Sequence, residues 1–243
     1  MTEPRPPEEP GGTSGKARLK VGDSIPVVGV RTGRIVRYPP DGNPSAYRKQ
    51  LVDGEVRITE RGIEGDEQAE PEPGHGPPDN AIHHYPFDHY AAFAVERPDL
   101  VPVLSEQGAF AENISTVGWT EWDVCIGDRF QLGTAEVELS QGRAPCWKLG
   151  RHLGDPLMVD HVTRTRRAGW YYRVTRPGTF AAGGMITLID RPHPEWPVAR
   201  AFGMVIAGDR DEAALDELLE IPELGMSWQL RIERLLISMR RRR

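Results

Sequence analysis

The chain has 243 residues, of which 38% are hydrophobic and 27% charged, a composition typical of one globular domain with a small appendage. Its formal net charge of −6 argues against stable nucleic-acid binding, and we interpret Arg240 to Arg243 as a solvated helix end. No stretch approaches the ~18 apolar residues of a membrane span, and the first twenty residues lack the apolar centre of a secretory signal. We therefore expect a cytoplasmic protein without a membrane partner.

The first third of the chain is predicted to start with a disordered segment over residues 1–22. This segment is rich in proline, glycine and charge, so it cannot bury enough apolar surface to offset the entropy of ordering. The β-branched stretch from Ile25 to Val36 then predicts a strand, residues 38–46 a loop, and Glu55 to Thr59 a second strand. Residues 65–80 are a polar loop so long that a role in function is expected.

The middle of the chain predicts one helix followed by strands. Phe87 to Glu96 is expected to be helical. Residues 128–141 predict a hairpin, because apolar and acidic residues alternate along its second half. Residues 169–176 and 184–190 predict two further strands joined by a turn at Pro177-Gly178.

The pattern changes to helical beyond a linker at residues 191–197. Apolar residues recur there at helical spacing: Leu215, Leu218, Leu219, Trp228, Ile232, Leu235, Leu236 and Met239. Asp209 and Ser227 are the expected N-caps, and Gly225 the expected helix stop. These features predict a small three-helix extension over residues 191–243, behind a mainly β body over residues 23–190. Helices this short are marginal alone, so they must dock on the body or on a second chain.

The two cysteines lie too far apart in sequence for a zinc-binding pair, and we consider each separately. Cys146 directly follows a predicted strand, and Arg143 and Lys148 flank it. Cationic neighbours favour the thiolate form, which is both a nucleophile and a metal ligand. The alternative for Cys146 is a small buried hydrophobic residue. Cys125 lies among apolar residues and is expected to fill the core.

Two other groups of residues could carry chemistry. His83, His84 and His89 suggest a zinc site, although their spacing is not that of a known zinc motif and Pro86 interrupts them; packing or hydrogen bonding is the other interpretation. His75 and Asp79 are better candidates for lining a cleft. The carboxylates Glu64, Asp66 and Glu67 could act as acid and base, or could accept hydrogen bonds from backbone amides in a tight turn.

Six strings in this order resemble the MOSC-domain family, and more narrowly its bacterial YiiM-type members: GIEGDEQ, HGPPDNAIHHYP, GAFAENIST, IGDRF, QGRAPCWKL and GWYYRV. The likeness extends from about Ile25 to Asp190, and the helical tail resembles the extension of that subgroup. One departure is Pro77, where the family usually has a glycine; proline stiffens the loop and removes an amide N–H.

The resemblance implies a mainly β fold with α-helices, in which a MOSC-type β-barrel holds the molybdenum cofactor, a molybdopterin with a terminal phosphate. The family's catalytic cysteine, which ligates the molybdenum, falls on Cys146. A thiolate is a suitable soft ligand for this metal. The residues assigned to cofactor binding are Ser45, Arg48, Lys49, His75, Asp79, Asn113, Arg143 and Lys148.

The implied activity is reduction of N-hydroxylated compounds, such as hydroxylaminopurine-type bases, by oxygen removal at the Cys146-ligated molybdenum. The chain has no flavin or nicotinamide motif, so an external electron-donor reductase is expected as partner. Two alternatives stay open: a carrier of the cofactor or of sulfur without reductase activity, and a zinc hydrolase built on the histidines. The sequence does not fix the oligomeric state, and a homodimer is one option.

Overall fold

The computed structural model describes residues 19–38, 42–69, 76–105 and 107–241. The predicted disordered segment therefore falls outside the described residues up to position 18, as does His75. From Leu19 onward the chain is part of the fold: the Leu19 side chain is buried, and the Gly22 N–H donates to the Leu188 carbonyl over 2.8 Å.

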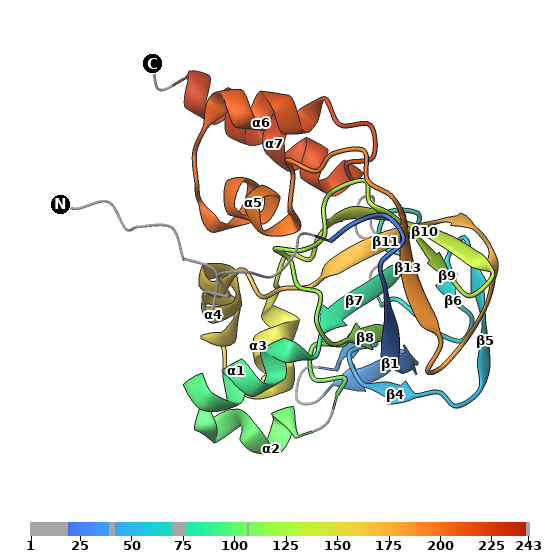
Figure 1. The fold of residues 1–243 in the computed structure, drawn as a ribbon. Helices are drawn as coiled ribbons and strands as arrows, with labels where there is room; N and C mark the ends of the chain where they lie inside the picture. The colour runs from blue at the N-terminus through green and yellow to red at the C-terminus, as the bar shows by residue number, and fades with distance from the viewer. Residues whose placement is uncertain (1–18, 39–41, 70–75, 106, 242–243) are drawn as a thin grey trace.

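Seven strands form a closed barrel (Figure 1). In spatial order they are β1 (Ser24–Gly33), β8 (Ile114–Thr116), β7 (Ile82–Pro86), β11 (Trp170–Arg176), β10 (Ala135–Gly142), β9 (Arg129–Leu132) and β13 (Met185–Asp190). Pairing of β13 with β1, where Ser24 lies opposite Thr187, closes the barrel. Neighbouring strands are antiparallel except β7 and β8, and β4 (Lys49–Leu51) extends β1 on its outer side. The predicted MOSC-type barrel body is thus confirmed.

The alternation in the predicted hairpin fills the barrel interior. Ala135, Val137 and Leu139 of β10 are fully buried, and the glutamates between them are more exposed. Phe130 and Leu132 of β9 are also fully buried. A strand places successive side chains on opposite faces, so one face of the hairpin packs into the core and the other faces outward.

Short strands outside the barrel correct two predictions. The predicted loop 38–46 contains part of a two-stranded ribbon, β2 (Val36–Tyr38) with β3 (Asn43–Ser45). Gly178 does not complete a simple turn; it begins β12 (Gly178–Ala181), which pairs with β5 (Glu55–Thr59), and β5 pairs with β6 (Gly62–Ile63). The β5–β12 pairing joins segments more than a hundred residues apart, which local patterns do not reveal.

Five short helices lie beside the barrel, on the side opposite β5 and β6 (Figure 1). They are α1 (Asp88–Glu96), η1 (Pro98–Leu100), α2 (Val101–Leu104), α3 (Trp147–Leu153) and α4 (Met158–Thr165). The predicted helix at residues 87–96 is confirmed as α1, whereas the sequence reading assigned no helix to α3 and α4. Among the described residues, no helix has both the length and the apolar character needed to cross a bilayer.

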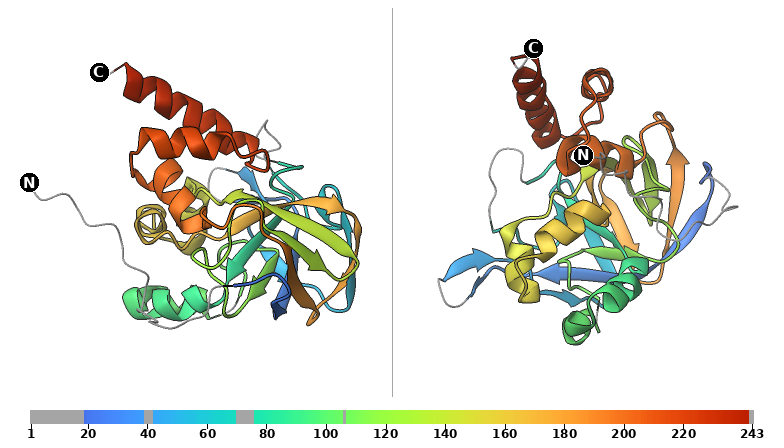
Figure 2. Two further views of the ribbon diagram at one scale, coloured as in Figure 1. Left: turned by 45° about the horizontal axis from the view of Figure 1, so that its top comes forward. Right: turned by 90° about the vertical axis from the view of Figure 1, so that its left-hand side faces the viewer.

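The tail contains the predicted three helices, which lie against one end of the barrel (Figure 2). They are α5 (Val198–Phe202), continued by a π-helical turn at Gly203–Ala207, α6 (Glu212–Leu219) and α7 (Met226–Arg240). The Gly225 N–H donates to the Ser140 carbonyl of β10 over 2.9 Å, and the buried Trp228 ring packs against Gly142 of the same strand. The tail therefore docks on the β body of its own chain.

The predicted helix ends in the tail were wrong. The side chain of Asp211 caps α6 by accepting from the Ala214 N–H over 3.1 Å, while Asp209 pairs with Arg166. Gly225 is the N-cap of α7 rather than a stop, and Ser227 donates to the Gln141 side chain. Contacts with the barrel decide the roles of these residues, so capping propensity alone did not identify them.

Candidate functional site

Cys146 lies where β10 leaves the barrel and α3 begins. The Arg143 N–H still donates to the Gly169 carbonyl, which extends the β10–β11 pairing by one step. Cys146 is then the N-cap residue of α3, with extended backbone angles, and its side chain is exposed. Burial, and to a lesser extent the nearby Cys146, raises the pKa of Tyr47. The accessible Cys146 thiol therefore has the Tyr47 hydroxyl as a neighbour.

A cavity of about 170 Å³, here named the inner chamber, is lined by residues on both sides of Cys146 in the sequence, Arg143 and Lys148. Its lining is mostly polar: Ser45, Ala46, Tyr47, Lys49, Asp66, Glu67, Gln68, Ala69, Asn80, His83, Ala111, Asn113, Arg143, Lys148 and Tyr171. These residues come from β3, β4, β7, β11, the first turn of α3, the chain just after β10, and the loops at 46–47, 66–69, 80 and 111–113.

Arg143 organises one wall of the inner chamber. Its guanidinium donates to the Phe110 carbonyl and to the Tyr47 hydroxyl, and it lies 3.4 Å from Nδ1 of His83. Burial, and then the charge of Arg143, hold the pKa of His83 well below its usual range, so this imidazole is neutral. Burial also raises the pKa of Tyr47 and of Tyr171. This wall therefore combines one fixed cation with neutral hydrogen-bonding groups.

Lys49 and Asp66 form the opposite wall as a buried ion pair. The Lys49 Nζ lies 2.5 Å from Asp66 Oδ2, and the two side chains are 8% and 5% exposed. Asp66 also accepts from the Asn113 side chain over 2.9 Å and from the Gly33 N–H over 2.7 Å. A side chain at Gly33 would start 2.7 Å from the Ala46 carbonyl oxygen, so this close approach of the backbone requires glycine.

These contacts decide between the two interpretations of the carboxylates in GIEGDEQ. Glu67 accepts from the Ile35 N–H over 2.6 Å, as Asp66 does from Gly33, while Glu64 is exposed. The carboxylates at 66 and 67 therefore accept from backbone amides, but these amides belong to residues 33 and 35 at the end of β1 and not to the carboxylates' own turn. Burial lowers the pKa of Lys49, and the Asp66 charge opposes that shift.

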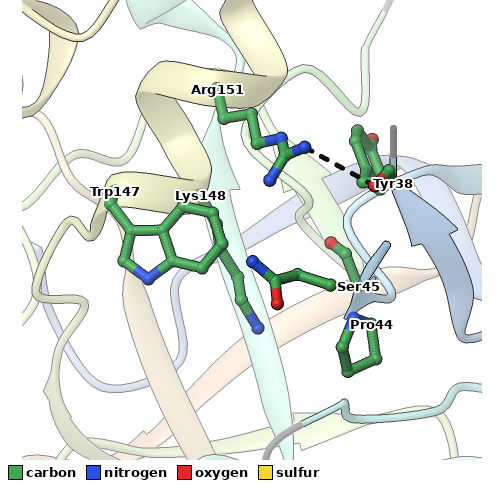
Figure 3. Close-up of a pocket in the computed structure, with 7 residues that line it drawn as sticks. Tyr38, Pro44, Ser45, Trp147, Lys148 and Arg151 are labelled. Atoms are coloured by element: carbon green, nitrogen blue, oxygen red, sulfur yellow. Dashed lines mark hydrogen bonds between the residues drawn. The ribbon is translucent and has the colours of Figure 1, made fainter. Parts of the chain in front are cut away.

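A much smaller cavity of about 10 Å³, here named the outer lobe, shares Ser45 and Lys148 with the inner chamber. Its lining residues are Tyr38, Asn43, Pro44, Ser45, Trp147, Lys148 and Arg151. Figure 3 shows Trp147, Lys148 and Arg151 projecting from α3 toward Ser45 and Pro44. Arg151 donates to the Tyr38 carbonyl over 3.5 Å.

The predicted cofactor residues divide among three places. Ser45, Lys49, Asn113, Arg143 and Lys148 converge on the inner chamber. Arg48 is exposed, and its guanidinium lies 5.0 Å from the centre of the Tyr38 ring, on the side of the outer lobe.

Asp79 lies elsewhere, although the sequence placed it in the same cleft. Its carboxylate accepts from Arg173 over 2.6 Å and from the Met226 N–H of the tail over 2.7 Å. Asp79 and Pro77 line a third cavity, between the 76–79 turn and the tail. In the described structure Asp79 thus fastens the tail to the barrel, and Pro77 lies apart from the inner chamber.

Sequence reasoning missed several residues of the inner chamber, above all Tyr47, Gln68, Asn80 and Tyr171. Tyr47 and Tyr171 are the aromatic members, and both interact with Arg143 and Cys146. The strand alternation of GWYYRV could have placed Tyr171 on the face opposite the buried Trp170 and Tyr172. No local pattern marks Tyr47, because its position depends on the irregular chain between β3 and β4.

The histidines of HHYPFDH have separate partners. His84 lies 2.8 Å from Thr116 Oγ1 and 3.0 Å from the Tyr172 hydroxyl, and His89 lies 2.7 Å from Glu121. Within the described ranges, no group of three or more His, Cys, Asp or Glu side chains is arranged to hold a metal ion. His84 and His89 are thus hydrogen-bonded core residues. Cys125 is also buried, as predicted.

Comparison with known proteins agrees with this arrangement. A model of the MOSC domain matches residues 71–187. Protein YiiM of Escherichia coli is 38% identical over 211 residues, which are 87% of this chain and 92% of YiiM. The crystal structure of Escherichia coli YiiM matches with a TM-score of 0.73 and 30% identity, covering 88% of this chain and 94% of that chain.

A protein named reductase, from Gibberella moniliformis, is 36% identical over 208 residues, which are 85% of this chain but only 36% of that longer protein. The match to YiiM extends over nearly the full length of both chains, so it includes the barrel and the tail together. The chain therefore belongs to the MOSC-domain family and is YiiM-like.

Proposed function

We propose that this chain is a molybdenum-cofactor-dependent reductase of N-hydroxylated compounds. The observation that carries the proposal is the accessible Cys146 thiol between Arg143 and Lys148, which both line the polar inner chamber. Membership of the MOSC-domain family supports the cofactor, and the relative named reductase supports the class of reaction.

The residues of the inner chamber fit a molybdopterin. Cys146 would supply the protein thiolate, a soft ligand suited to molybdenum beside the pterin dithiolene. Ser45, Lys49, Asn113, Arg143 and Lys148 would meet the polar edges and the phosphate. Gln68 also contributes an acceptor: its amide donates to the Asn80 carbonyl, and its buried Oε1 has no hydrogen-bond partner among the described residues. A pterin amine would satisfy such an atom.

When bound, the cofactor supplies two-electron redox chemistry at a metal. The overall reaction breaks the N–O bond of R–NHOH; two electrons and two protons are consumed, and the amine R–NH2 and water are released. The electrons must come from an external donor reductase, because no flavin or nicotinamide motif occurs in this chain. Tyr47, kept in its neutral form by burial and oriented by Arg143, holds a proton next to the reacting side of Cys146.

The test is metal and pterin analysis of protein made in a cofactor-competent host, followed by turnover of an N-hydroxylated base with an artificial electron donor. We expect about one molybdenum and one pterin per chain, and release of the amine. Bound cofactor without turnover would favour the alternative of a cofactor or sulfur carrier. Protein that binds neither molybdenum nor pterin would contradict the proposal.

A further inference from the structure

A buried carboxylate, that of Glu121, lies in the segment between β8 and β9, outside the lining of the inner chamber. Its side chain is 1% exposed, and its two oxygens have different partners. Oε1 accepts from the Gly169 N–H over 2.6 Å, and Oε2 accepts from Nε2 of His89 over 2.7 Å. Burying a carboxylate is unfavourable unless donors compensate for it, and an apolar side chain often fills such a place equally well. The two hydrogen bonds therefore point to a role in holding the partners of Glu121.

Gly169 connects this carboxylate to the wall of the inner chamber. Its carbonyl accepts from the Arg143 N–H over 3.0 Å, one step beyond the last paired residues of β10 and β11. Its backbone has a φ of +72°, and a Cβ at this position would lie 2.3 Å from the His84 carbonyl oxygen of β7. Only glycine fits there, and its N–H and carbonyl are held by different parts of the chain.

Arg143 lies where the pairing of β10 with β11 ends, and the end of a strand ladder opens more readily than its middle. Its guanidinium donates to the Phe110 carbonyl and to the Tyr47 hydroxyl, so its position shapes the wall of the chamber near Cys146. If the Gly169 peptide rotated away, the Arg143 backbone would be released and the guanidinium would shift with it. Glu121 opposes this rotation, because it binds the N–H of the glycine whose carbonyl binds Arg143.

The segment that contains Glu121 also carries the tail. Three backbone hydrogen bonds of 2.8–3.0 Å join residues 121–126 to the linker and α5, from Ile126 N–H to the Trp196 carbonyl, from Val198 N–H to the Val124 carbonyl and from Ala199 N–H to the Glu121 carbonyl. The backbone of Glu121 is thus fixed by the tail, while its side chain is bound to the glycine beside the chamber.

We propose that Glu121 is a positioning residue for Arg143: it holds the Gly169 peptide, and through it the wall of the inner chamber, in the geometry that a bound cofactor requires. The part of this inference that concerns the cofactor rests on the proposed function. The property that matters is the reach of the side chain rather than its charge, because an acceptor atom must lie at the Gly169 N–H.

The position of Arg143 can be followed by NMR in the full-length chain without cofactor, through its Nε–H signal, which Arg143→Lys removes and thereby assigns. Glu121→Gln keeps the length and the acceptor, so the signal should stay at its wild-type position. Glu121→Asp keeps the charge but is one methylene shorter, and Glu121→Leu has no acceptor, so both should shift or broaden the signal. Leu188→Ala controls for lost core packing, since Leu188 is buried on β13, which is not adjacent to β10 or β11, and it should leave the signal unchanged.

A wild-type signal in Glu121→Asp, or a shifted signal in Glu121→Gln, would overturn the proposal. Glu121→Asp decides the test if Glu121→Leu does not fold.

Retention of the cofactor is the second measurement. Loaded Glu121→Asp should release pterin about 10-fold faster than the wild type, because the loss of one well-placed contact from Arg143 corresponds to about that factor. Glu121→Gln and Leu188→Ala should release it at the wild-type rate, and equal release from Glu121→Asp would refute the effect on the cofactor. If the Arg143 signal moves as expected but not even the wild type binds pterin, the proposed function fails and the positioning role stands. If the cofactor is bound and turned over while the signal is the same in every Glu121 variant, the positioning role fails and the proposed function stands.

Discussion

The inner chamber and the outer lobe share Ser45 and Lys148, yet they treat positive charge in opposite ways. In the chamber, Lys49 is buried against Asp66, and Arg143 is enclosed by Phe110 and Tyr47. Beside the lobe, the exposed Arg48 and the half-buried Arg151 lie near the Tyr38 ring. Removing a charge from water is costly unless a partner compensates for it, so the buried cations are fixed in place.

Buried and exposed cations therefore have different roles. A buried, compensated cation shapes a wall and orients its neighbours, and it can bind a ligand only if the ligand fits that fixed geometry. An exposed cation such as Arg48 keeps its contact with water. The two regions therefore differ in how firmly their cations are held in place.

The largest expected effect is at the junction of the two regions. Cys146→Ser in cofactor-loaded protein should reduce turnover below detection and weaken molybdenum retention, because the soft thiolate ligand is lost. Cys125→Ala is the matched control, since this second thiol is buried between β8 and β9, against the linker to the tail, and its loss should leave metal content and turnover unchanged. Metal analysis and N-hydroxylated base reduction measure both variants. Full metal content and activity in Cys146→Ser would show that the Cys146 thiol is not the metal ligand.

A large loss of stability is expected from breaking the buried pair. Lys49→Gln should lower the free energy of unfolding by about 3–5 kcal/mol, because it leaves the buried Asp66 carboxylate without its cation. Urea denaturation at pH 7 measures this loss. The double variant with Asp66→Asn should recover part of it, since neither side chain is then charged. A fully additive double variant would show that the pair is not coupled.

A much smaller effect is expected one residue away. Arg48→Gln should change the free energy of unfolding by less than about 1 kcal/mol, because Arg48 is exposed and its ring contact with Tyr38 is open to solvent. The same denaturation experiment applies. If Arg48→Gln lowered the free energy of unfolding as much as Lys49→Gln does, the exposed and buried cations would not differ in their contribution to stability.

The sequence predicted the parts of the molecule that local pattern determines. Alternation in the 128–141 hairpin indicated which side chains enter the barrel, and the cations around Cys146 pointed to the thiol at the chamber. It could not indicate that Lys49 would be buried, because lysine is ordinarily a surface residue and its partner Asp66 is brought near by pairing of β1 with β4. Adjacent residues such as Arg48 and Lys49 therefore looked equivalent.

Asp79 illustrates the same limit. The family resemblance placed it with the cofactor residues, but in the fold its carboxylate faces Arg173 and the backbone of α7. Only docking of the tail on the barrel creates that environment. The helix caps in the tail were mispredicted for a related reason, since Ser227 satisfies the buried Gln141 rather than its own helix.

A small, pH-dependent effect is expected at His152, which connects the two regions. Its Nδ1 lies 2.8 Å from the Tyr38 hydroxyl in the lobe, and its ring centre lies 5.4 Å from that of Tyr47 in the chamber. Burial, followed by the charges of Arg48 and Arg143, lowers its pKa to about 4. One cation of each region thus disfavours protonation of this imidazole.

The sign of the pH effect follows from that shift. Unfolded chains take up the proton near pH 6.5, whereas the folded chain resists protonation down to about 4. The contribution of neutral His152 to stability is therefore complete above pH 6.5 and is lost as the pH falls toward 4. Between pH 7 and pH 5 we expect the wild type to lose about 1 kcal/mol more than His152→Gln, after allowance for partial exposure. Urea denaturation at the two pH values measures this difference, and the buried His83 and His84 affect both proteins alike. Equal pH dependence in the two proteins would mean that the cations do not act on His152.

In the variant Arg48→Gln the pKa of His152, followed by NMR, should rise toward its ordinary value, because the repulsion from Arg48 is gone while that from Arg143 persists.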